Sequence, residues 1–570
     1  MKHILAGFCM LLSTGGILVY PQEAATENAL MILEDRGEVI LEFEHPGPQM
    51  LNWLSKWISI DRVDRETVKA YANREGFERF LELDVPYRVL DWPGKNIKRT
   101  RKGYLPVTSW QVYPTYEQYD SLMVAFQENH PQRCRLDTIG YSQEGRALLV
   151  VKISDHVEMD EAEPEFFYTS SMHGDELGGY VLMLRLIDYL LNQYGIDPQA
   201  TRLVDSVEIW INPLANPDGA YHDGNHTIAG ATRFNANGVD LNRNFPDPVA
   251  GPHPDGQDHQ PETTAMMEFM QGRHFSMSAN FHGGEEVVNY PWDTWQKRHA
   301  DDAWFQFISH EYADTAQAYS VNYMNGFNDG ITNGYDWYSI TGGRQDYTTY
   351  FLNGRETTIE LDVSKITPEA ELDQLWNYNY RSFINYMAQV LYGIHGSVTD
   401  ADNETQAVPA MVTIVGYDLD NSMVYSDSIH GFYARLLNEG TYDLTFSADG
   451  YFDQTVSGVA VSNYRTTRLD IALVKNTSAV SGPSEAPFQL SIFPNPARGY
   501  ANLTLELETE ATVALHIIDL NGRIVFQTAP EKFGVGTIEK SLELDFLEPG
   551  SYIIQLEVNG QMLRNRLIKL

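Results

Sequence analysis

Two kinds of hydrophobic pattern alternate through the middle of the chain. At 116–131 and 179–195, apolar residues recur every three to four positions, which predicts amphipathic helices. Shorter and mostly apolar runs predict strands, bounded by turn residues. The clearest strands are 147–154, 165–171 and the first part of 206–219. Strands that alternate with helices indicate a mixed sheet flanked by helices, so we expect one α/β domain over 106–392.

A smaller pattern of the same kind precedes this region. Residues 38–50 and 86–93 predict strands, and 64–83 predicts a helix because its apolar residues recur at helical spacing. We therefore expect a small α/β unit over 26–105. It ends near 95–106, the most basic patch in the chain. The unit is either an inhibitory pro-segment that is removed at that patch or an accessory domain.

From residue 393 onward the pattern changes to short alternating strands and turn residues. Residues 393–475 predict a small β-sandwich. Residues 476–487 are rich in Ser and Pro, which is typical of a linker. A second all-β unit follows at 488–570. The fold class that we expect is therefore α/β followed by two small all-β sandwich domains.

The first 25 residues predict an export signal. Lys2 precedes an apolar run, and acidic residues follow it. Ser, Thr and Gly interrupt the run at 13–16, which favours a cleaved signal over a membrane anchor. No later segment is apolar enough to cross a bilayer, so we expect no transmembrane segment in the mature protein.

The overall composition narrows the possible partners. The 570 residues exceed what one core can bury, and 43% hydrophobic residues fit packed domains. The formal charge of −38 argues against nucleic acid as a partner, because phosphate would be repelled. Loss of Cys9 with the signal would leave only Cys134, which excludes an internal disulfide. Stability would then come from the cores, a bound metal, or both.

Several side chains at or near predicted strand ends are candidates for a metal site. His173 and Glu176, three residues apart, are either a pair of metal ligands or merely polar residues at a strand end. A catalytic zinc site has three protein ligands and one open position, and His282 could supply the third. His222 and His226 lie in a polar loop, where a solvated role is favoured. The acidic loop at 247–263 either binds calcium or is a solvated, turn-rich segment.

Together these segments resemble the zinc metallocarboxypeptidases, and most closely the regulatory subfamily that includes carboxypeptidases D, E, M and N. The shared motifs, in chain order, are HGDE (173–176), NPDG (216–219), DLNRNFPD (240–247), NFHGGEEVVNYPWD (280–293), NGYDWYSITGGRQDY (333–347) and TIELDVSK (358–365). The spacings agree as well, since Arg233 lies nine residues before Asn242 and Tyr338 lies 22 before Glu360. The resemblance implies the metallocarboxypeptidase fold, with its eight-stranded type of mixed sheet.

The resemblance also implies a catalytic centre. One Zn²⁺ per chain would be bound by His173, Glu176 and His282, and Asp240 would orient a ligand histidine. Glu360, which lies in a predicted strand, would activate the zinc-bound water and then pass the proton to the leaving amine. Taken alone, a carboxylate in such a strand is either functional or paired.

A second group of residues is implied to bind the substrate. Arg233 would stabilise the developing oxyanion together with the metal. Asn242, Arg243 and Tyr338 would hold the terminal carboxylate, a role that suits the fork of an arginine. Such a clamp would make the protein an exopeptidase that acts on the C-termini of peptides or proteins.

The resemblance further implies a preference for C-terminal Lys or Arg, because Asp293 and Gln345 stand at the positions that recognise the last side chain. Three departures from the family pattern bear on this. Arg344 stands where relatives commonly have Met and would weaken the preference for a cation. Asp362 would lie on the same strand face as Glu360 and raise its pKa. Val363 replaces a cysteine that has no catalytic role.

Two rival functions remain open at this stage. A zinc amidase or deacylase on the same scaffold, acting on a non-peptide or cell-wall amide, would share the metal ligands but not the clamp. The intact Asn242, Arg243 and Tyr338 favour the carboxypeptidase. A catalytically inactive binding module would have lost the general base or a metal-binding residue, whereas the base and all three metal-binding residues are present here.

The all-β units resemble two known domains. Residues 393–475 resemble the transthyretin-like domain of this subfamily, which has either a structural or a ligand-binding role. The last unit resembles the C-terminal sorting domain of type IX secretion cargo, on the segments 493–507, 513–525 and 547–570. This implies the type IX secretion machinery as a partner. The protein would cross the outer membrane of a Gram-negative bacterium and be released or attached to the cell surface.

Overall fold

The computed structural model describes residues 22–97, 110–476 and 490–570, except for 494, 496, 498, 508, 520–522, 545, 548, 549, 560 and 570. Residues 22–25 of the expected signal belong to helix α1 (Gln22–Arg36), and the rest of that signal lies outside the described residues. Most of the basic patch (98–106) and of the expected linker (477–487) also lies outside them. The chain forms two compact units, Met1–Lys475 and Asn476–Leu570.

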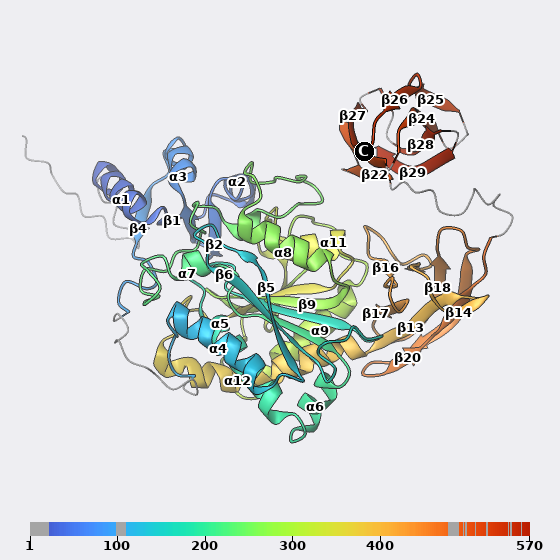
Figure 1. Cartoon of the computed structure of the whole chain (residues 1–570). Coiled ribbons are helices and arrows are strands. Elements are labelled where there is room, and N and C mark those ends of the chain that lie inside the picture. The colour runs from blue at the N-terminus through green and yellow to red at the C-terminus, as the bar shows by residue number, and fades with distance from the viewer. Residues whose placement is uncertain are drawn as a thin grey trace, which may run out of the picture. The chain divides into compact units, whose positions relative to one another are not determined.

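An eight-stranded sheet in the order β11-β10-β12-β9-β7-β8-β6-β5 forms the centre of the first unit (Figure 1). Its strands are β5 (Cys134–Tyr141), β6 (Ala147–Ile153), β7 (Glu165–Ser170), β8 (Glu208–Asn212), β9 (Phe275–His282), β10 (Glu286–Tyr290), β11 (Ile331–Asn333) and β12 (Glu356–Leu361). The pairs β7·β8, β7·β9 and β9·β12 are parallel, whereas β5·β6, β6·β8 and β10·β12 are antiparallel. The predicted mixed sheet is therefore confirmed.

Helices cover both faces of this sheet. The longer ones are α4 (Tyr116–Asn129), α5 (Gly178–Gln193), α8 (Pro261–Gln271), α9 (Asp302–Gln317) and α12 (Leu372–Ala388). Side chains of a strand alternate between its two faces, and β7 shows this directly. Phe166 and Tyr168 belong to the core shared with α4, α5, α9 and α12, while Phe167 packs in the core shared with α8. Figure 1 shows α8 on one side of the sheet and α4, α5 and α12 on the other.

The small N-terminal α/β unit (residues 22–97) is part of the first compact unit. It contains an antiparallel sheet in the order β2-β3-β1-β4. Its strands are β1 (Val39–Glu44), β2 (Ser59–Val63), β3 (Thr67–Ala72) and β4 (Tyr87–Leu90), and its helices are α1, α2 (Pro48–Leu54) and α3 (Arg74–Leu81). Apolar residues of both the strands and the helices form one core. This unit is the small α/β structure that the sequence predicts.

The predicted helix over 64–83 is wrong in its first half, where β3 lies. Val68 and Ala70 are buried in this strand, which pairs with β1 and β2 on its two sides. The helix begins only after Asn73, whose side chain accepts a hydrogen bond from the Gly76 N–H and caps α3. Burial between two strands outweighs a weak helical periodicity.

A β-sandwich follows the α/β domain within the first unit. One sheet contains β13 (Gly393–Asp400), β14 (Asn403–Ala407), β17 (Phe432–Arg435), β20 (Thr466–Arg468) and β21 (Ile471–Leu473). The other contains β15 (Met411–Ile414), β16 (Val424–Tyr425), β18 (Gly440–Ser447) and β19 (Gln454–Val461). Their inward residues form one core, as expected for a sandwich.

The second unit is also all-β in its described part. Its strands are β22 (Leu490–Phe493), β23 (Tyr500–Leu507), β24 (Ala511–Asp519), β25 (Ile524–Gln527), β26 (Glu531–Phe533), β27 (Gly536–Glu543), β28 (Gly550–Val558) and β29 (Gln561–Lys569). They form sheets in the orders β22-β23-β27 and β25-β24-β28-β29, with β26 paired to β24, around a separate core. Within the described part of the whole chain, no helix is both long and apolar enough to cross a membrane.

Candidate active site

Three buried side chains converge at the carboxyl edge of the central sheet. His173 and Glu176 lie between β7 and α5, and His282 ends β9, the strand beside β7. The Nδ1 atoms of His173 and His282 are 3.1 Å apart. Glu176 Oε1 lies 2.9 Å from His173 Nδ1, and Glu176 Oε2 lies 2.8 Å from His282 Nδ1. Two nitrogens and a carboxylate thus point at one place.

The outer nitrogen of each histidine has a fixed partner. His173 Nε2 lies 3.0 Å from Asp240 Oδ1, and His282 Nε2 contacts Asn280 Oδ1. An imidazole that donates through Nε2 presents a lone pair at Nδ1. Two such lone pairs that face each other beside a carboxylate repel one another unless a cation lies between them. The residues therefore fit a zinc ion, which accepts this donor set.

Asn280 is not among the site residues predicted from the sequence. Its amide nitrogen donates to Glu356 Oε1 at 2.9 Å, and this turns its oxygen toward His282. The signal was present in the sequence, since Asn280 precedes His282 by two positions in a strand and so shares its face.

The motifs HGDE (173–176) and NPDG (216–219) form the loops around His173. Gly174 packs so closely against Gly219 that a Cβ at residue 174 would lie 2.3 Å from a backbone carbon. Asn216 donates to the Met172 carbonyl at 3.2 Å and accepts from the Gly219 N–H at 2.9 Å. A larger residue at position 174 would displace the histidine loop.

Glu360 lies in β12 and faces the same cavity as the three convergent side chains. Burial, followed by the Glu176 carboxylate, raises the pKa of Glu360 well above its ordinary value. Within the described residues its Oε2 atom has no hydrogen-bond partner.

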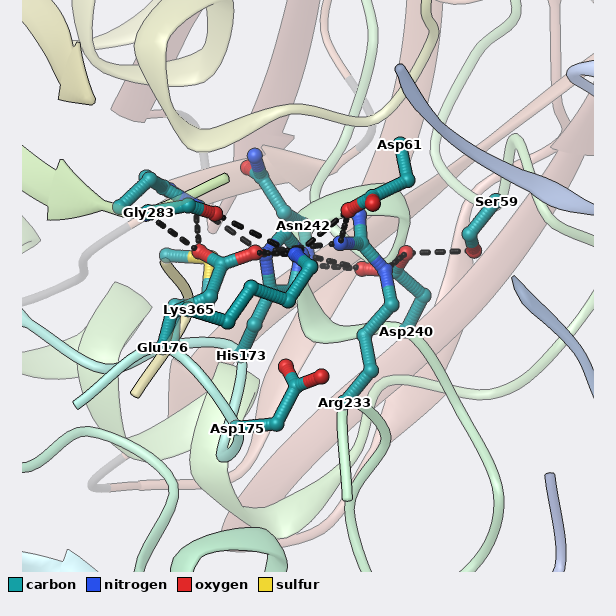
Figure 2. A network of polar contacts seen from close by, with 12 residues as sticks. Ser59, Asp61, His173, Asp175, Glu176, Arg233, Asp240, Asn242, Gly283 and Lys365 are labelled. Atoms are coloured by element: carbon teal, nitrogen blue, oxygen red, sulfur yellow. Dashed lines mark hydrogen bonds and ion pairs between the residues drawn. The ribbon is translucent and has the colours of Figure 1, made fainter. Parts of the chain in front are cut away.

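Two cations contact the convergent carboxylate (Figure 2). Arg233 Nη1 lies 3.3 Å from Glu176 Oε1, and Arg233 Nε donates to Asp240 Oδ2 at 3.0 Å. Lys365 Nζ lies 2.6 Å from the same Glu176 oxygen and 3.2 Å from the Gly283 carbonyl. Lys365 is the last residue of the motif TIELDVSK, but no role was predicted for it.

The three residues predicted to clamp a carboxylate line the same cavity: Asn242, Arg243 and Tyr338. Arg243 is buried, and its Nη1 atom donates to the Asn242 carbonyl at 2.9 Å. Among the described residues, Arg243 forms no ion pair and its Nε atom has no hydrogen-bond partner. A buried guanidinium without a carboxylate partner is suited to an anionic ligand.

Asp293 also lines this cavity and is the acidic counterpart of Arg243. Gln345 Nε2 and Asn289 Nδ2 donate to Asp293 Oδ1 at 3.0 and 3.1 Å. Burial raises the pKa of Asp293 to about 6. In the part of the chain that the structure describes, no cationic side chain forms an ion pair with it.

Comparison with known proteins identifies the family. A model described as Zinc carboxypeptidase matches residues 119–382. Carboxypeptidase N catalytic chain of Rattus norvegicus is 35% identical over 411 residues, which cover 65% of this chain and 89% of that relative. Carboxypeptidase SOL1 of Arabidopsis thaliana is 35% identical over 377 residues, which cover 64% and 73%. The chain belongs to the zinc carboxypeptidase family.

Carboxypeptidase D of Mus musculus is 38% identical over 377 residues, which cover 63% of this zinc carboxypeptidase but only 27% of that relative. The chain thus spans about a quarter of the length of the carboxypeptidase D relatives. A model described as Carboxypeptidase regulatory-like domain matches residues 393–474, and one described as Secretion system C-terminal sorting domain matches 491–570. These matches confirm both resemblances of the all-β units, and the second indicates type IX export.

One departure of this zinc carboxypeptidase from the family pattern has a structural explanation. Arg344 is fully buried and forms a bidentate pair with Glu356, with Nε–Oε1 at 2.9 Å and Nη2–Oε2 at 2.7 Å. It does not line the cavity, so the expectation that it acts beside the substrate pocket is wrong. Glu356 also accepts a hydrogen bond from Asn280, whose side-chain oxygen contacts His282. Arg344 is therefore linked to His282 through Glu356 and Asn280.

The expectation for Asp362 is also wrong. Strand β12 ends at Leu361, so Asp362 does not continue the strand face of Glu360. It accepts hydrogen bonds from the Ser364 N–H at 2.9 Å and the Thr367 hydroxyl at 2.6 Å. The raised pKa of Glu360 comes from burial and Glu176 instead.

The remaining candidates outside the cavity are ordinary polar residues. His222 and His226 are exposed, as their polar loop predicted. In the acidic loop, Asp247 accepts from the Gly342 N–H at 3.1 Å and Asp255 accepts from Asn244 at 2.8 Å. None of the described groups able to hold a metal ion includes this loop.

Proposed function

We propose that this zinc carboxypeptidase removes Lys or Arg from the C-termini of peptides and proteins. One observation carries the proposal. The cavity that contains the convergent His173, Glu176 and His282 is also lined by a buried cation and a buried anion, Arg243 and Asp293, neither of which has an ion-pair partner among the described residues. A C-terminal Lys or Arg carries one charge for each of them.

The metal site has a defined task in this proposal. His173, Glu176 and His282 would hold zinc, which when bound supplies a Lewis acid for the scissile carbonyl and lowers the pKa of water. Asp240 and Asn280 contact the Nε2 atoms of the two imidazoles, which leaves each Nδ1 atom to bind the metal.

Proton transfer is assigned to Glu360. Its carboxylate takes the proton of the attacking water and gives it to the amine that leaves. The raised pKa of the buried carboxyl group makes it a stronger base than an exposed glutamate. Arg233, which is buried and already adjoins Glu176, donates hydrogen bonds to the oxyanion that forms.

Substrate selection is assigned to two groups of cavity residues, one basic and one acidic. Arg243, with Asn242 and Tyr338, binds the free carboxylate, so that a peptide with a blocked C-terminus loses its anchor. Asp293, oriented by Gln345, binds the cationic side chain. An apolar last residue would leave this buried carboxylate unpaired, which disfavours it.

The setting of the reaction follows from the sorting domain. We propose that the enzyme crosses the outer membrane of a Gram-negative bacterium by the type IX machinery and acts outside the cell, either released or surface-attached. Its substrates would then be extracellular peptides or proteins with basic C-termini.

Mass-spectrometric analysis of two matched peptides tests the activity. Both end in Arg, one with a free carboxylate and one with a C-terminal amide, and each is incubated with the full chain with and without a chelator. We expect Arg to be released from the free peptide only, with loss on chelation and recovery on adding zinc. If the protein hydrolyses non-peptide amides but releases no Arg from the peptide with a free carboxylate, the result would favour the zinc amidase or deacylase instead.

A further inference from the structure

A buried carboxyl group behind the cavity, that of Asp346, contacts the backbone of Asp293. Both Asp346 oxygens lie 3.1 Å from the Asp293 nitrogen, and Oδ2 also accepts a hydrogen bond from the Thr294 N–H at 2.8 Å. Asp346 is only 1% exposed and belongs to helix α11 (Arg344–Phe351). It does not line the active-site cavity, so any effect that it has on a ligand passes through Asp293.

The segment that carries Asp293 depends on contacts of this kind. Strand β10 ends at Tyr290, and residues 291–300 form neither helix nor strand. The Asp293 carbonyl accepts from the Ile340 N–H at 3.3 Å. Among the described residues, the N–H groups of Asp293 and Thr294 find no acceptor other than Asp346. Without that carboxyl group, two buried donors would lose their partner, which is costly.

Helix α11 holds the side chain of Asp293 as well as its backbone. Gln345 Nε2 donates to Asp293 Oδ1 at 3.0 Å, and Gln345 Oε1 accepts from the Thr358 N–H of β12 at 2.8 Å. Asn289 supplies a second donor to the same Oδ1 atom. In the part of the chain that the structure describes, Asp293 Oδ2 has no hydrogen-bond partner, and this residue lines the cavity. Fixing the backbone and Oδ1 thus determines where the free oxygen lies.

The protonated form of Asp346 can still hold both N–H groups. Burial and the neighbouring Asp293 carboxylate raise the pKa of Asp346 well above its ordinary value. A proton on Oδ1 leaves Oδ2, which lies 3.1 and 2.8 Å from the two backbone nitrogens, as the acceptor. An asparagine side chain offers the same single acceptor. Asp346→Asn is therefore the conservative variant, whereas Asp346→Ala removes the acceptor.

We propose that Asp346 is a positioning residue for substrate specificity: by holding the N–H groups of Asp293 and Thr294, it sets the free Asp293 oxygen where the cation of a C-terminal Lys or Arg reaches it. The inference rests on the proposed function, which gives Asp293 that role. A carboxyl group in the first turn of a helix can also simply stabilise the helix. A purely structural role would change the cleavage of all peptides alike, whereas positioning Asp293 changes the discrimination between them.

The direct test compares two peptides that differ only in a C-terminal Arg or Leu. Both are assayed with the wild type, Asp346→Ala and Asp346→Asn. We expect Asp346→Ala to lower the ratio of kcat/KM for Arg over Leu about tenfold, mainly through a higher KM for the Arg peptide, because small displacements of a positioned group have effects of this order. The kcat for the Leu peptide and the zinc content should not change. Asp346→Asn should keep most of the ratio.

Thr349→Ala is the matched control for this test. Thr349 is buried in the same helix, and its hydroxyl has no hydrogen-bond partner among the described residues. This variant should keep the wild-type ratio even if it is less stable. If Asp346→Ala does not fold, which circular dichroism would reveal, Asp346→Ser replaces it, because the serine hydroxyl is too short to reach both N–H groups. A folded Ala or Ser variant with the wild-type ratio, or an equal loss in Asp346→Asn, overturns the proposal.

Hydrogen exchange separates this proposal from the proposed function. Mass spectrometry follows the exchange of backbone N–H groups at 291–296 in the full chain. If the wild type has no preference for Arg, the proposed specificity fails, and the exchange rate then tests Asp346 by itself. Faster exchange in Asp346→Ala than in both the wild type and Thr349→Ala supports the positioning role in that case, and equal exchange overturns it. If the wild type prefers Arg, the ratio of kcat/KM is the deciding result.

Discussion

Glu360 lies directly beside His282 in the central sheet. Strands β12 and β9 pair in parallel with these two residues in register. The proposed base and a proposed metal ligand therefore come from adjacent rigid strands, whose spacing the backbone hydrogen bonds fix. A site built on strands holds its geometry better than one built on loops. This register predicts that the base can be removed without disturbing the metal.

Replacing the base separates chemistry from metal binding. In Glu360→Gln we expect kcat to fall by a factor of about 10² to 10⁴, because general base catalysis contributes that much. Zinc content, measured by elemental analysis, should equal that of the wild type. A variant that keeps its activity would show that another group takes the proton.

The side-chain amide of Asn280, which contacts His282, should control the affinity of the site for the metal. Asn280→Ala removes the hydrogen bond to His282 Nε2, and loss of such a partner weakens metal binding by about 10- to 100-fold. Competition with a chromogenic chelator measures this change. Asn192→Ala, at an exposed position on α5, is the control and should leave zinc affinity unchanged. Equal affinities for both variants would contradict the assignment of His282 as a ligand.

Substrate preference should depend on pH through Asp293. Burial raises the pKa of this carboxyl group to about 6, so it is charged above pH 6 and becomes neutral below it. The ratio of kcat/KM for an Arg-ending peptide to that for a Leu-ending peptide should therefore fall as the pH drops below about 6. Taking the ratio cancels the titration of Glu360 and the metal ligands. A ratio constant from pH 5 to 8 would exclude Asp293 as the cation partner.

A buried ion network joins the catalytic domain to the sandwich. Asp301 binds Arg355 Nε at 2.7 Å and the Arg435 guanidinium of β17 at 2.8 and 2.9 Å. Burial raises the pKa of Asp301, but the two arginines outweigh burial and hold the pKa well below its ordinary value. The charged form is therefore the one that stabilises the fold.

Removing that carboxylate should destabilise the protein. Asp301→Ala leaves the buried Arg355 without an ion-pair partner among the described residues, whereas Arg435 keeps Asp418, and we expect a cost of about 3–5 kcal/mol. Thermal and denaturant unfolding measure the loss, with Asp314→Ala at an exposed position of α9 as the control. Equal stability of the two variants would mean that another group neutralises Arg355.

The α/β domain and the candidate site could be predicted from the sequence for a physical reason. A strand that is buried on both faces appears in the sequence as a continuous, mostly apolar run, and β7 is buried at every position. The candidate metal-binding residues lie at or just after the ends of these strands, and in such sheets functional sites gather at the carboxyl ends of the strands. The sequence pattern was therefore enough to place His173 and His282 at one sheet edge.

Contacts between distant segments could not be predicted in the same way. The strand β3 carries apolar residues that also fit a helix, and only its two neighbouring strands decide the outcome. Arg344 was expected to weaken the preference for a cation, yet its side chain is paired with Glu356, twelve residues away. Likewise, nothing in the sequence near Asp61 indicates that it meets Lys365.

The preference for a basic last residue is the central claim, and one comparison tests it most directly. The ratio of kcat/KM for an Arg-ending to a Leu-ending peptide is measured for the wild type and for Asp293→Asn. We predict a ratio well above one for the wild type and a fall of about 10- to 100-fold in the variant, mainly through the Arg peptide. A wild type that prefers Leu, or a ratio that Asp293→Asn leaves unchanged, would contradict the account.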